Sequence, residues 1–251
     1  MCLNIIITGA SRGIGRAVAL EFAQRSAKAE DNKDKYNIFR NCAKNEAMLK
    51  EVKQAVNDMG VRCEMFTGDI SDYGTAMRMF DEAHRLFGSV DILVNNAGIS
   101  MIGLFQDLSR DDWERIMNVN VGSVYNCCHF AIPDMVSKKQ GRIINISSVW
   151  GNTGASCEAA YSASKGAVNS LTKALAKELA PSGISVNAVA CGAIDTDMNA
   201  FLSEEERNLL LEEIPAGRMG LPSEAARTVL QLAESPSYLT GQILTLDGGW
   251  T

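Results

Sequence analysis

The feature that most constrains the fold is a glycine-rich turn that directly follows an apolar run. The run Leu3–Ile7 ends in three isoleucines, as expected of a parallel strand buried on both faces. The turn Thr8–Gly15 (TGASRGIG) comes next and opens a helical pattern. Glycines permit a tight turn, and the first N–H groups of the helix are free to bind phosphate. This order of strand, turn and helix predicts a dinucleotide-binding site rather than a glycine-rich turn without a ligand.

The rest of the chain alternates short apolar runs with longer amphipathic segments. The predicted strands are Leu3–Ile7, Tyr36–Asn41, Arg62–Thr67, Ile92–Asn95, Arg142–Ser147, Ser185–Val189 and Ile243–Leu246. The predicted helices are Ala17–Ala27, Ala47–Met59, Thr75–Phe87, Asp111–Met135, Tyr161–Ala180 and Ser223–Ala233. This alternation predicts a doubly wound α/β Rossmann fold, with a seven-stranded parallel sheet flanked by helices. No repeat or linker divides the sequence, so we expect residues 1–251 to form a single dinucleotide-binding and catalytic domain.

Two segments interrupt this rhythm. The charge-dense stretch Lys28–Lys35 predicts a solvated loop before the second strand. The stretch Asp195–Pro215 has no strand pattern, and Ser203 followed by three glutamates predicts a capped helix outside the core layers.

Composition narrows the classes of partner. The net charge of −6 gives no reason to expect nucleic acid. Seven cysteines at irregular spacing, without a Cys-x-x-Cys pair, argue against a disulfide framework and against a zinc site, so we expect no metal. The sequence shows neither a signal peptide nor a long apolar stretch, and we therefore expect a cytoplasmic protein that does not enter a membrane.

A second group of residues suggests proton transfer. Tyr161 and Lys165 are four residues apart in a helical segment, which places them on one helical face. A free tyrosine has a pKa near ~10, and a nearby cation favours the phenolate and lowers that pKa. Ser148 ends an apolar strand, at the edge where parallel sheets bind their ligands. Each residue alone fits an ordinary packing or surface position, but together they predict general acid–base chemistry.

Two further motifs are NNAG at Asn95–Gly98 and the segment Asn118–Gly122. With them, the sequence resembles the short-chain dehydrogenase/reductase family, and the resemblance extends from Leu3 to Trp250. The resemblance implies that Ser148 hydrogen-bonds the substrate oxygen, that Tyr161 protonates it, and that Lys165 binds the cofactor ribose and tunes Tyr161. It implies that Asn120 holds a water that links Lys165 to solvent, and that the protein is a homotetramer. The residues implied to bind cofactor are Gly9, Ser11, Arg12, Gly13, Ile14, Gly15, Lys44, Asp69, Ile70, Asn96, Ala97, Gly98, Tyr161, Lys165, Gly192, Ile194 and Thr196.

The end of the second strand indicates which dinucleotide is bound. It lacks the acidic residue that holds the ribose 2′-hydroxyl in NAD-selective sites. Arg12 and Lys44 are cations suited to a 2′-phosphate, and Arg40 lies nearby in the sequence. We therefore expect NADP(H), although these cations would also fit a solvated surface.

One position departs from the family pattern. The family usually has proline before the glycine at Gly192, and this sequence has Cys191. Cysteine cannot fix the backbone angle φ as proline does, so we expect a more mobile loop around the nicotinamide. No histidine or aspartate partner is evident for Cys191, so a nucleophilic role has little support. His84 and His129 lie in helical segments and are expected to be packing or surface residues.

The substrate is open between two branches of the family. The leading expectation is reduction of a ketone on acyl carrier protein, because Asp195–Met198 and Leu246–Trp250 resemble 3-oxoacyl-[acyl-carrier-protein] reductases. Lys138 and Lys139 would then dock the acidic carrier. The segment Ser147–Glu158 instead resembles reductases of the 5-aminopentanone group on elongation factor P, and Glu158 would pair with the substrate ammonium.

A different class of function is a dinucleotide-binding sensor that catalyses nothing. Such a protein would be expected to lose Tyr161 or Lys165, and this sequence keeps both.

Overall fold

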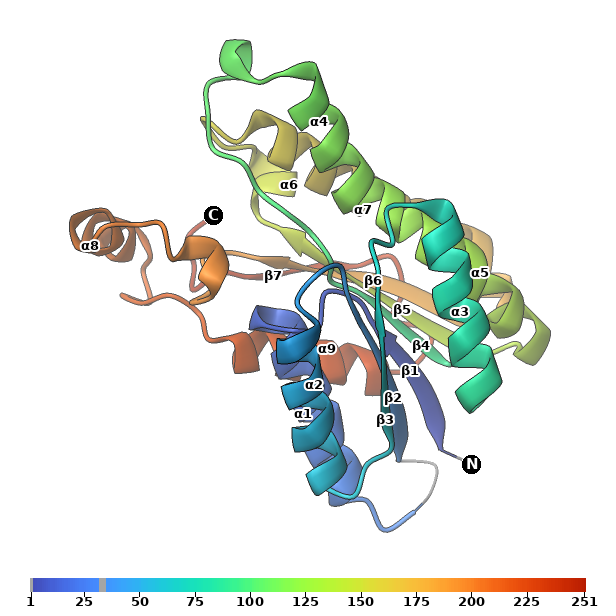
Figure 1. Ribbon diagram of the computed structural model, residues 1–251. Helices are drawn as coiled ribbons and strands as arrows, with labels where there is room; N and C mark the ends of the chain where they lie inside the picture. The colour runs from blue at the N-terminus through green and yellow to red at the C-terminus, as the bar shows by residue number, and fades with distance from the viewer. Residues whose placement is uncertain (1, 32–34) are drawn as a thin grey trace.

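The computed structural model describes residues 2–31 and 35–251 and forms one Rossmann-like α/β domain (Figure 1). Seven parallel strands make one sheet in the order β3-β2-β1-β4-β5-β6-β7. They are β1 (Leu3–Ile7), β2 (Tyr36–Cys42), β3 (Cys63–Thr67), β4 (Ile92–Asn95), β5 (Gly141–Ser148), β6 (Ile184–Cys191) and β7 (Ile243–Leu246). The predicted fold and all seven predicted strands are confirmed, with strand ends shifted by no more than about two residues, as is usual at element boundaries.

Helices cover both faces of the sheet (Figure 1). They are α1 (Gly13–Ala27), α2 (Glu46–Asp58), α3 (Tyr73–Phe87), α4 (Arg110–Met117), α5 (Ser123–Lys138), α6 (Trp150–Thr153), α7 (Ala159–Leu179), α8 (Glu204–Glu213) and α9 (Pro222–Glu234). Helices α1, α2 and α9 bury their apolar sides in one core, and α3, α5 and α7 bury theirs in the other. None of the helices in the described part of the chain is long and apolar enough to cross a membrane.

The isoleucine run in β1 shows why the strands are apolar on both faces. Ile5 and Ile7 point into the core under α1, α2 and α9, whereas Ile6 points into the core on the opposite face. All three are at most 2% exposed. Successive side chains of a strand alternate between faces, so a strand covered on both sides needs apolar residues at consecutive positions.

The long predicted helix Asp111–Met135 is wrong as a single α-helix. Helices α4 and α5 are joined by one π-helical turn at Asn118–Gly122. Single π turns inside α-helices place an extra residue in the turn and occur frequently at functional sites. This turn carries Asn120, whose side chain reaches out of the helix to Ile99.

The segment around α8 lies outside the sheet layers, as predicted. Ser203 caps the helix through its hydroxyl, which accepts from the Glu206 backbone, and the Glu206 carboxylate accepts from the Ser203 backbone in return. This reciprocal pair satisfies two of the free N–H groups at the helix start. The predicted loop Lys28–Lys35 is exposed or partly buried at Lys28–Asp31, and residues 32–34 lie outside the described residues.

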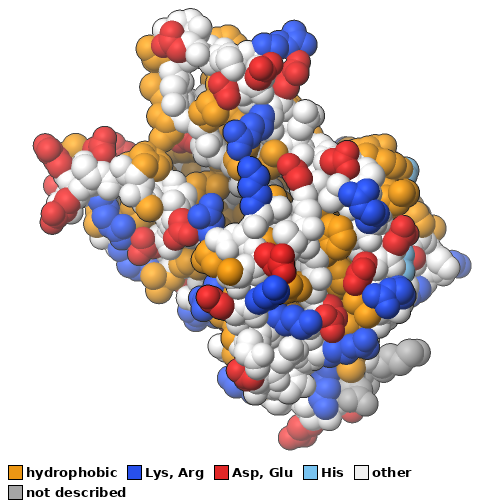
Figure 2. Space-filling model, viewed as in Figure 1, with side chains coloured by type: hydrophobic (Ala, Val, Ile, Leu, Met, Phe, Trp, Pro, Cys, Tyr) orange, Lys and Arg blue, Asp and Glu red, His pale blue; other side chains and the backbone are white. Residues whose placement is uncertain are grey.

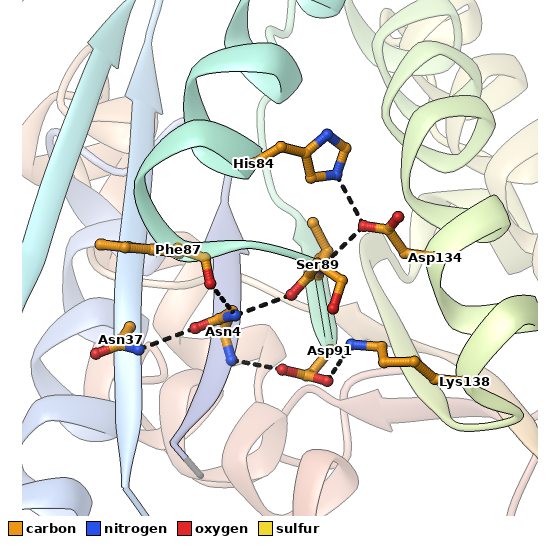
Figure 3. Close-up of polar contacts among 9 residues, drawn as sticks. Asn4, Asn37, His84, Phe87, Ser89, Asp91, Asp134 and Lys138 are labelled. Carbon is orange, nitrogen blue, oxygen red and sulfur yellow. Dashed lines mark hydrogen bonds and ion pairs between the residues drawn. The ribbon is translucent and has the colours of Figure 1, made fainter.

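A polar network fastens the amino ends of the strands (Figure 3). The Asn4 amide on β1 donates to the carbonyl oxygens of Phe87 and Ser89, at 2.8 and 2.9 Å, on the connection that leads into β4. The Asp91 carboxylate accepts from the Asn4 backbone at 2.8 Å and from the Lys138 ammonium at the end of α5. These bonds join the amino ends of β1 and β4 to the end of α5.

Candidate active site

Thr8 joins the glycine-rich turn to the loop after β4. Its hydroxyl oxygen accepts from the backbone N–H groups of Asn96 and Ala97, at 2.9 and 3.0 Å. The Asn96 side-chain amide donates back to the carbonyl oxygens of Thr8 and Gly9, both at 3.0 Å. Strands β1 and β4 are neighbours at the point where the strand order reverses, which is where open α/β sheets bind ligands. The two loops predicted to hold the cofactor are thus held together at that point.

The turn fits a dinucleotide diphosphate. A Cβ added at Gly15 would lie 2.5 Å from both the Gly9 carbonyl oxygen and the Asn96 side-chain nitrogen, so only glycine fits next to these two groups. Arg12, the N-cap of the fifteen-residue helix α1, makes no side-chain capping bond. An uncapped helix start presents free N–H groups and the positive end of the helix dipole to an anion. The predicted residues Ser11, Gly13 and Ile14 lie on this turn.

Lys165 lies buried beside Gly98. Its side chain is carried by α7, the residue is 4% exposed, and its ammonium donates to the Ile146 carbonyl oxygen at 2.8 Å. The position of a Cβ on Gly98 lies 3.5 Å from the Lys165 Nζ and 3.4 Å from the Asn120 Oδ1. The loop after β4 therefore passes next to both side chains.

Asn120 holds that loop from the other side. Its amide NH₂ donates to the Ile99 carbonyl oxygen and to the Ser164 hydroxyl, both at 2.9 Å, and its Oδ1 accepts from the Ile99 backbone at 2.8 Å. Both donor hydrogens of the amide are used by protein groups. The structure thus brings Asn120 to the site, and its link to a water stays a prediction.

Tyr161 and Ser148 meet at the carboxyl end of β5. Ser148 is the last residue of β5, and its hydroxyl accepts from the Trp150 backbone N–H at 3.2 Å. The Ser148 side chain is hydrogen-bonded to the Tyr161 phenol. The Lys165 ammonium lies 5.6 Å from the centre of the Tyr161 ring. The structure therefore brings the four predicted catalytic residues together at the carboxyl ends of the strands: Asn120, Ser148, Tyr161 and Lys165.

Burial dominates the titration of these groups. It raises the pKa of Tyr161, an effect reinforced by the Glu158 carboxylate and opposed by the hydrogen bond with Ser148. Lys165 is not among the causes of this shift, and its tuning of Tyr161 stays a prediction. Burial also lowers the pKa of Lys165 to about 8. The phenol is accordingly protonated at neutral pH and can act as an acid.

The predicted cofactor residues after β6 lie against the turn. A Cβ on Gly13 would lie 3.4 Å from the Thr196 methyl carbon, so the segment after β6 packs over the turn. Ile194 is buried and pairs with Gly220, and Gly192 packs against Asp247. Cys191 is the buried last residue of β6 and is paired with β5 and β7.

The cations near the end of β2 divide into two groups. Arg12 and Lys44 are exposed, and Arg12 forms an ion pair with Asp197 at 3.3 Å. Arg40 is fully buried; it donates to the Leu49 carbonyl oxygen at 2.8 Å and to the Cys63 sulfur at 3.1 Å. Arg40 thus ties α2 to β3 and is withdrawn from the surface where a 2′-phosphate would bind.

Asp69 and Ile70 follow β3 and differ in exposure. Asp69 is exposed and accepts from the Ser71 hydroxyl at 2.7 Å, whereas Ile70 is 3% exposed. The Asn126 amide of α5 donates to the Ile70 carbonyl oxygen at 2.9 Å. This bond fixes the loop that was predicted to flank the adenine.

Comparison with known proteins gives the family. The model for short chain dehydrogenases matches residues 3–207. The chain belongs to the short-chain dehydrogenase family. It is 39% identical over 247 residues to the uncharacterized oxidoreductase YmfI of Bacillus subtilis, covering 98% of this chain and 97% of that protein. It is 38% identical over 250 residues to the 3-oxoacyl-[acyl-carrier-protein] reductase FabG of Staphylococcus aureus, covering 99% and 98%.

A solved structure agrees with these sequence relatives. The crystal structure of the 3-oxoacyl-[acyl-carrier protein] reductase from Brucella melitensis superimposes with a TM-score of 0.90 at 33% identity, covering 99% of this chain and 91% of that chain. This short-chain dehydrogenase is therefore an oxidoreductase that acts on carbonyl or hydroxyl groups with a nicotinamide dinucleotide.

Lys138 and His84 of this short-chain dehydrogenase both lie at the amino ends of the strands. The Lys138 ammonium is paired with Asp91 at the amino edge of the sheet, opposite the edge that carries Tyr161 (Figure 3). It is thus poorly placed to dock a carrier at the site entrance. His84 lies at the same edge, where its ring contacts the Asp134 carboxylate at 2.8 Å, in agreement with the predicted packing role.

Sequence reasoning missed several residues that shape the site. Thr8 appeared only as the first letter of the turn, and Ser164 and Trp250 were not singled out. The one available signal was for Thr8, because a hydroxyl directly after a buried strand has no apolar role there and needs hydrogen-bond partners. Trp250 gave no such signal, since its partners lie far away in the sequence.

Burial of Lys165 makes the stability of this protein depend on pH. A lysine whose pKa falls to about 8 in the folded state, from an ordinary 10.5, binds fewer protons when folded than when unfolded between these values. The cost of burying its charge is therefore fully present below pH 8 and is relieved as the pH rises toward 10.5. Lys165→Met removes this dependence.

Between pH 7 and pH 10, we expect the unfolding free energy of the wild type to rise by about 2–3 kcal/mol relative to that of Lys165→Met. Urea denaturation of both proteins at each pH measures this change, and Lys173→Met, an exposed lysine on the same helix, is the matched control. A difference between the proteins that stays constant with pH would contradict the burial of a charged ammonium.

Proposed function

We propose that this enzyme reduces a ketone to a secondary alcohol with NADPH, and that its substrate is of the 3-oxoacyl-[acyl-carrier-protein] type. The observation that carries the proposal is the Tyr161 phenol, which is held by Ser148, kept protonated by burial and placed beside the buried ammonium of Lys165. The near full-length similarity to a 3-oxoacyl-[acyl-carrier-protein] reductase supports the substrate class.

The reaction needs a proton donor at the ketone oxygen. When bound, the nicotinamide supplies the hydride that reduces the carbonyl carbon. Ser148 and Tyr161 bind the carbonyl oxygen, and the Tyr161 phenol transfers its proton to that oxygen as negative charge develops there. The products are the secondary alcohol and a phenolate, which the Lys165 ammonium stabilises through its charge.

The phenolate must regain a proton before the next turnover. The Lys165 ammonium lies 5.6 Å from the centre of the Tyr161 ring and, like Asn120, lies next to Gly98. We assign the water that links Lys165 to solvent to the main chain of Asn120, because the donor hydrogens of its side-chain amide are already bonded. The π turn at Asn118–Gly122 supports this assignment, since such a turn breaks the regular pattern of helix carbonyl bonds.

Apolar side chains at the site entrance support an acyl substrate. The segment between β4 and α4 and the segment around α8 project beyond the sheet (Figure 1), and Figure 2 shows a hollow between them. Each segment carries three exposed apolar side chains, which are Ile102, Leu104 and Phe105 on one side and Met198, Phe201 and Leu209 on the other. Apolar surface on both sides of a cleft suits an alkyl chain.

We also propose that the enzyme assembles as a homotetramer through the helices α4, α5 and α7. Tyr125 and Val136 of α5 support this proposal, because they are 55% and 41% exposed in the single chain. A monomeric mass in sedimentation velocity would contradict it.

Loss of the phenol should separate binding from chemistry. We expect Tyr161→Phe to bind NADPH as the wild type does and to lose about 10²–10⁴-fold in kcat with an acetoacetyl thioester, because only the general acid is removed. Fluorescence titration measures binding, and NADPH oxidation measures turnover.

Near-normal kcat in Tyr161→Phe would reject the assignment of the proton donor. A wild-type protein that binds NADPH and turns over no ketone, in either direction, would instead be a dinucleotide-binding sensor.

The choice of NADPH rests on Arg12. Its ion pair with Asp197 leaves the two side chains 62% and 58% exposed, and such exposed pairs contribute little. The guanidinium is therefore available to a 2′-phosphate, which it can bind through two parallel hydrogen bonds. Lys44 is exposed after β2 and supplies a second cation.

We expect NADPH to bind more tightly than NADH, and Arg12→Ala to erase most of the difference. A charge-assisted hydrogen bond contributes about 1.5–3 kcal/mol, which corresponds to roughly a tenfold to hundredfold change in Kd. Arg16→Ala, an exposed cation on the next turn of α1, is the control and should leave the ratio unchanged. Equal affinities for the two cofactors in the wild type would contradict the proposed preference for NADPH.

A second candidate substrate is a ketone that carries an ammonium, as on the 5-aminopentanone group of elongation factor P. The Glu158 carboxylate supports it, because it lies near enough to raise the pKa of Tyr161 and accepts from the Ser100 hydroxyl at 2.7 Å. Glu158 has no cationic partner among the ion pairs of the described residues. A substrate ammonium would supply one.

Glu158→Gln keeps the shape of the side chain and removes its charge. If the substrate carries an ammonium, KM for an amino-ketone should rise roughly tenfold or more, while KM for a neutral ketone stays constant. Glu178→Gln, at an exposed position of α7, the helix that Glu158 precedes as N-cap, is the control. An unchanged ratio of kcat/KM for the two ketones would exclude this candidate and leave the acyl substrate.

A further inference from the structure

The last residues of the chain fold back over the edge of the site. After β7, the Asp247 carboxylate accepts from the backbone of Gly249 at 2.9 Å and from the backbone and hydroxyl of Thr251 at 2.8 and 3.0 Å. A Cβ on Gly192 would lie 2.7 Å from the Asp247 Cβ, so this turn packs directly on the loop that follows β6. We call residues 247–251 the C-terminal turn.

Within the C-terminal turn, Trp250 contacts two separate parts of the enzyme. Its indole packs edge-on against Trp150, with ring centres 4.8 Å apart. Its Nε1–H donates to the Glu213 carboxylate at 3.3 Å, at the last residue of α8. One side chain therefore bridges α6 and the end of α8.

Each end of this bridge leads to a functional element. Trp150 is the first residue of α6, and its backbone N–H is the group that donates to the Ser148 hydroxyl at 3.2 Å. At the other end, the Ala216 backbone donates to the Gly248 carbonyl oxygen at 3.1 Å. The end of α8 is thus pinned to the C-terminal turn by its backbone as well as by Trp250. Helix α8 itself buries none of its residues.

We propose that Trp250 is a positioning residue that holds Ser148 in place through Trp150 and couples it to α8. The proposal rests on the role assigned to Ser148 under the proposed function. Ser148 is the last residue of β5, where its backbone is paired with Cys191, and its hydroxyl accepts from the backbone of Trp150, which follows the strand. Aromatic side chains supply a large rigid contact surface with few rotatable bonds, which suits such a bridge.

The test is a double-mutant cycle between Trp250→Ala and Ser148→Ala. A displacement of about 1 Å in a reacting group can cost on the order of 10²-fold in rate. We expect Trp250→Ala to lower kcat about tenfold to a hundredfold, with Kd for NADPH changed less than about twofold. In the Ser148→Ala background the same change should have no further effect on kcat, because the residue through which Trp250 acts is gone.

The cycle uses whichever ketone or secondary alcohol the wild type turns over, so failure of the acyl-substrate proposal leaves it intact. Tyr238→Ala, which removes a 98% exposed aromatic side chain ahead of β7, is the control for loss of an aromatic residue near the C-terminus. If Trp250→Ala does not fold, the cycle is run with Trp250→Phe, which keeps a ring at the contact and loses the bond to Glu213. Equal losses of kcat with and without Ser148 would overturn the proposal.

A spectroscopic measurement tests the contact itself. Two indoles at this separation couple and give an exciton couplet in circular dichroism. The couplet should be present in the wild type and in Trp113→Phe, since Trp113 packs against Phe105 rather than another tryptophan, and absent in Trp250→Phe. A couplet that persists in Trp250→Phe, or is missing from the wild type, would also overturn the proposal.

Discussion

The site depends on the four hydrogen bonds between Thr8 and Gly9 on one loop and Asn96 and Ala97 on the other. Neighbouring parallel strands bring two loops to the same edge, but each loop has free polar groups that water would otherwise satisfy. The Thr8 hydroxyl and the Asn96 amide satisfy these groups within the protein. The helix start of α1 and Gly98 are therefore held in fixed positions before any ligand binds, which lowers the entropic cost of binding.

Two buried cations show how position decides what a charge does. Arg40 and Lys165 are both buried and both donate to backbone carbonyl oxygens. Arg40 lies within β2 under α2, where its charge only joins two elements. Lys165 lies beyond the strand ends, next to the Tyr161 phenol, and its pKa falls to about 8. The same burial that is a structural cost at Arg40 makes Lys165 responsive to protons near neutral pH.

The sequence was sufficient for the fold and for the gathering of Ser148, Tyr161 and Lys165, because strand periodicity and local motifs depend on neighbouring residues. It was not sufficient for features set by distant contacts. Asn120 on the π turn bonds to Ile99 and Ser164, and the raised pKa of Tyr161 arises from burial. The inward direction of Arg40 likewise depends on Cys63 and on α2, which no local pattern in β2 records.

The amino and carboxyl ends of the strands differ in how they are held, and this difference bears on substrate choice. At the amino edge, Asn4 and Asp91 bind backbone groups and neighbouring strands directly (Figure 3). At the carboxyl ends of the strands, α8 buries none of its residues; Arg207 in its first turn pairs with Asp195, and Glu213 at its last position accepts from Trp250. A helix that buries none of its residues can shift as a unit at little cost in packing. Changes in the residues of α8 can therefore alter which ketone enters without disturbing the bonds that set Tyr161, Ser148 and Lys165.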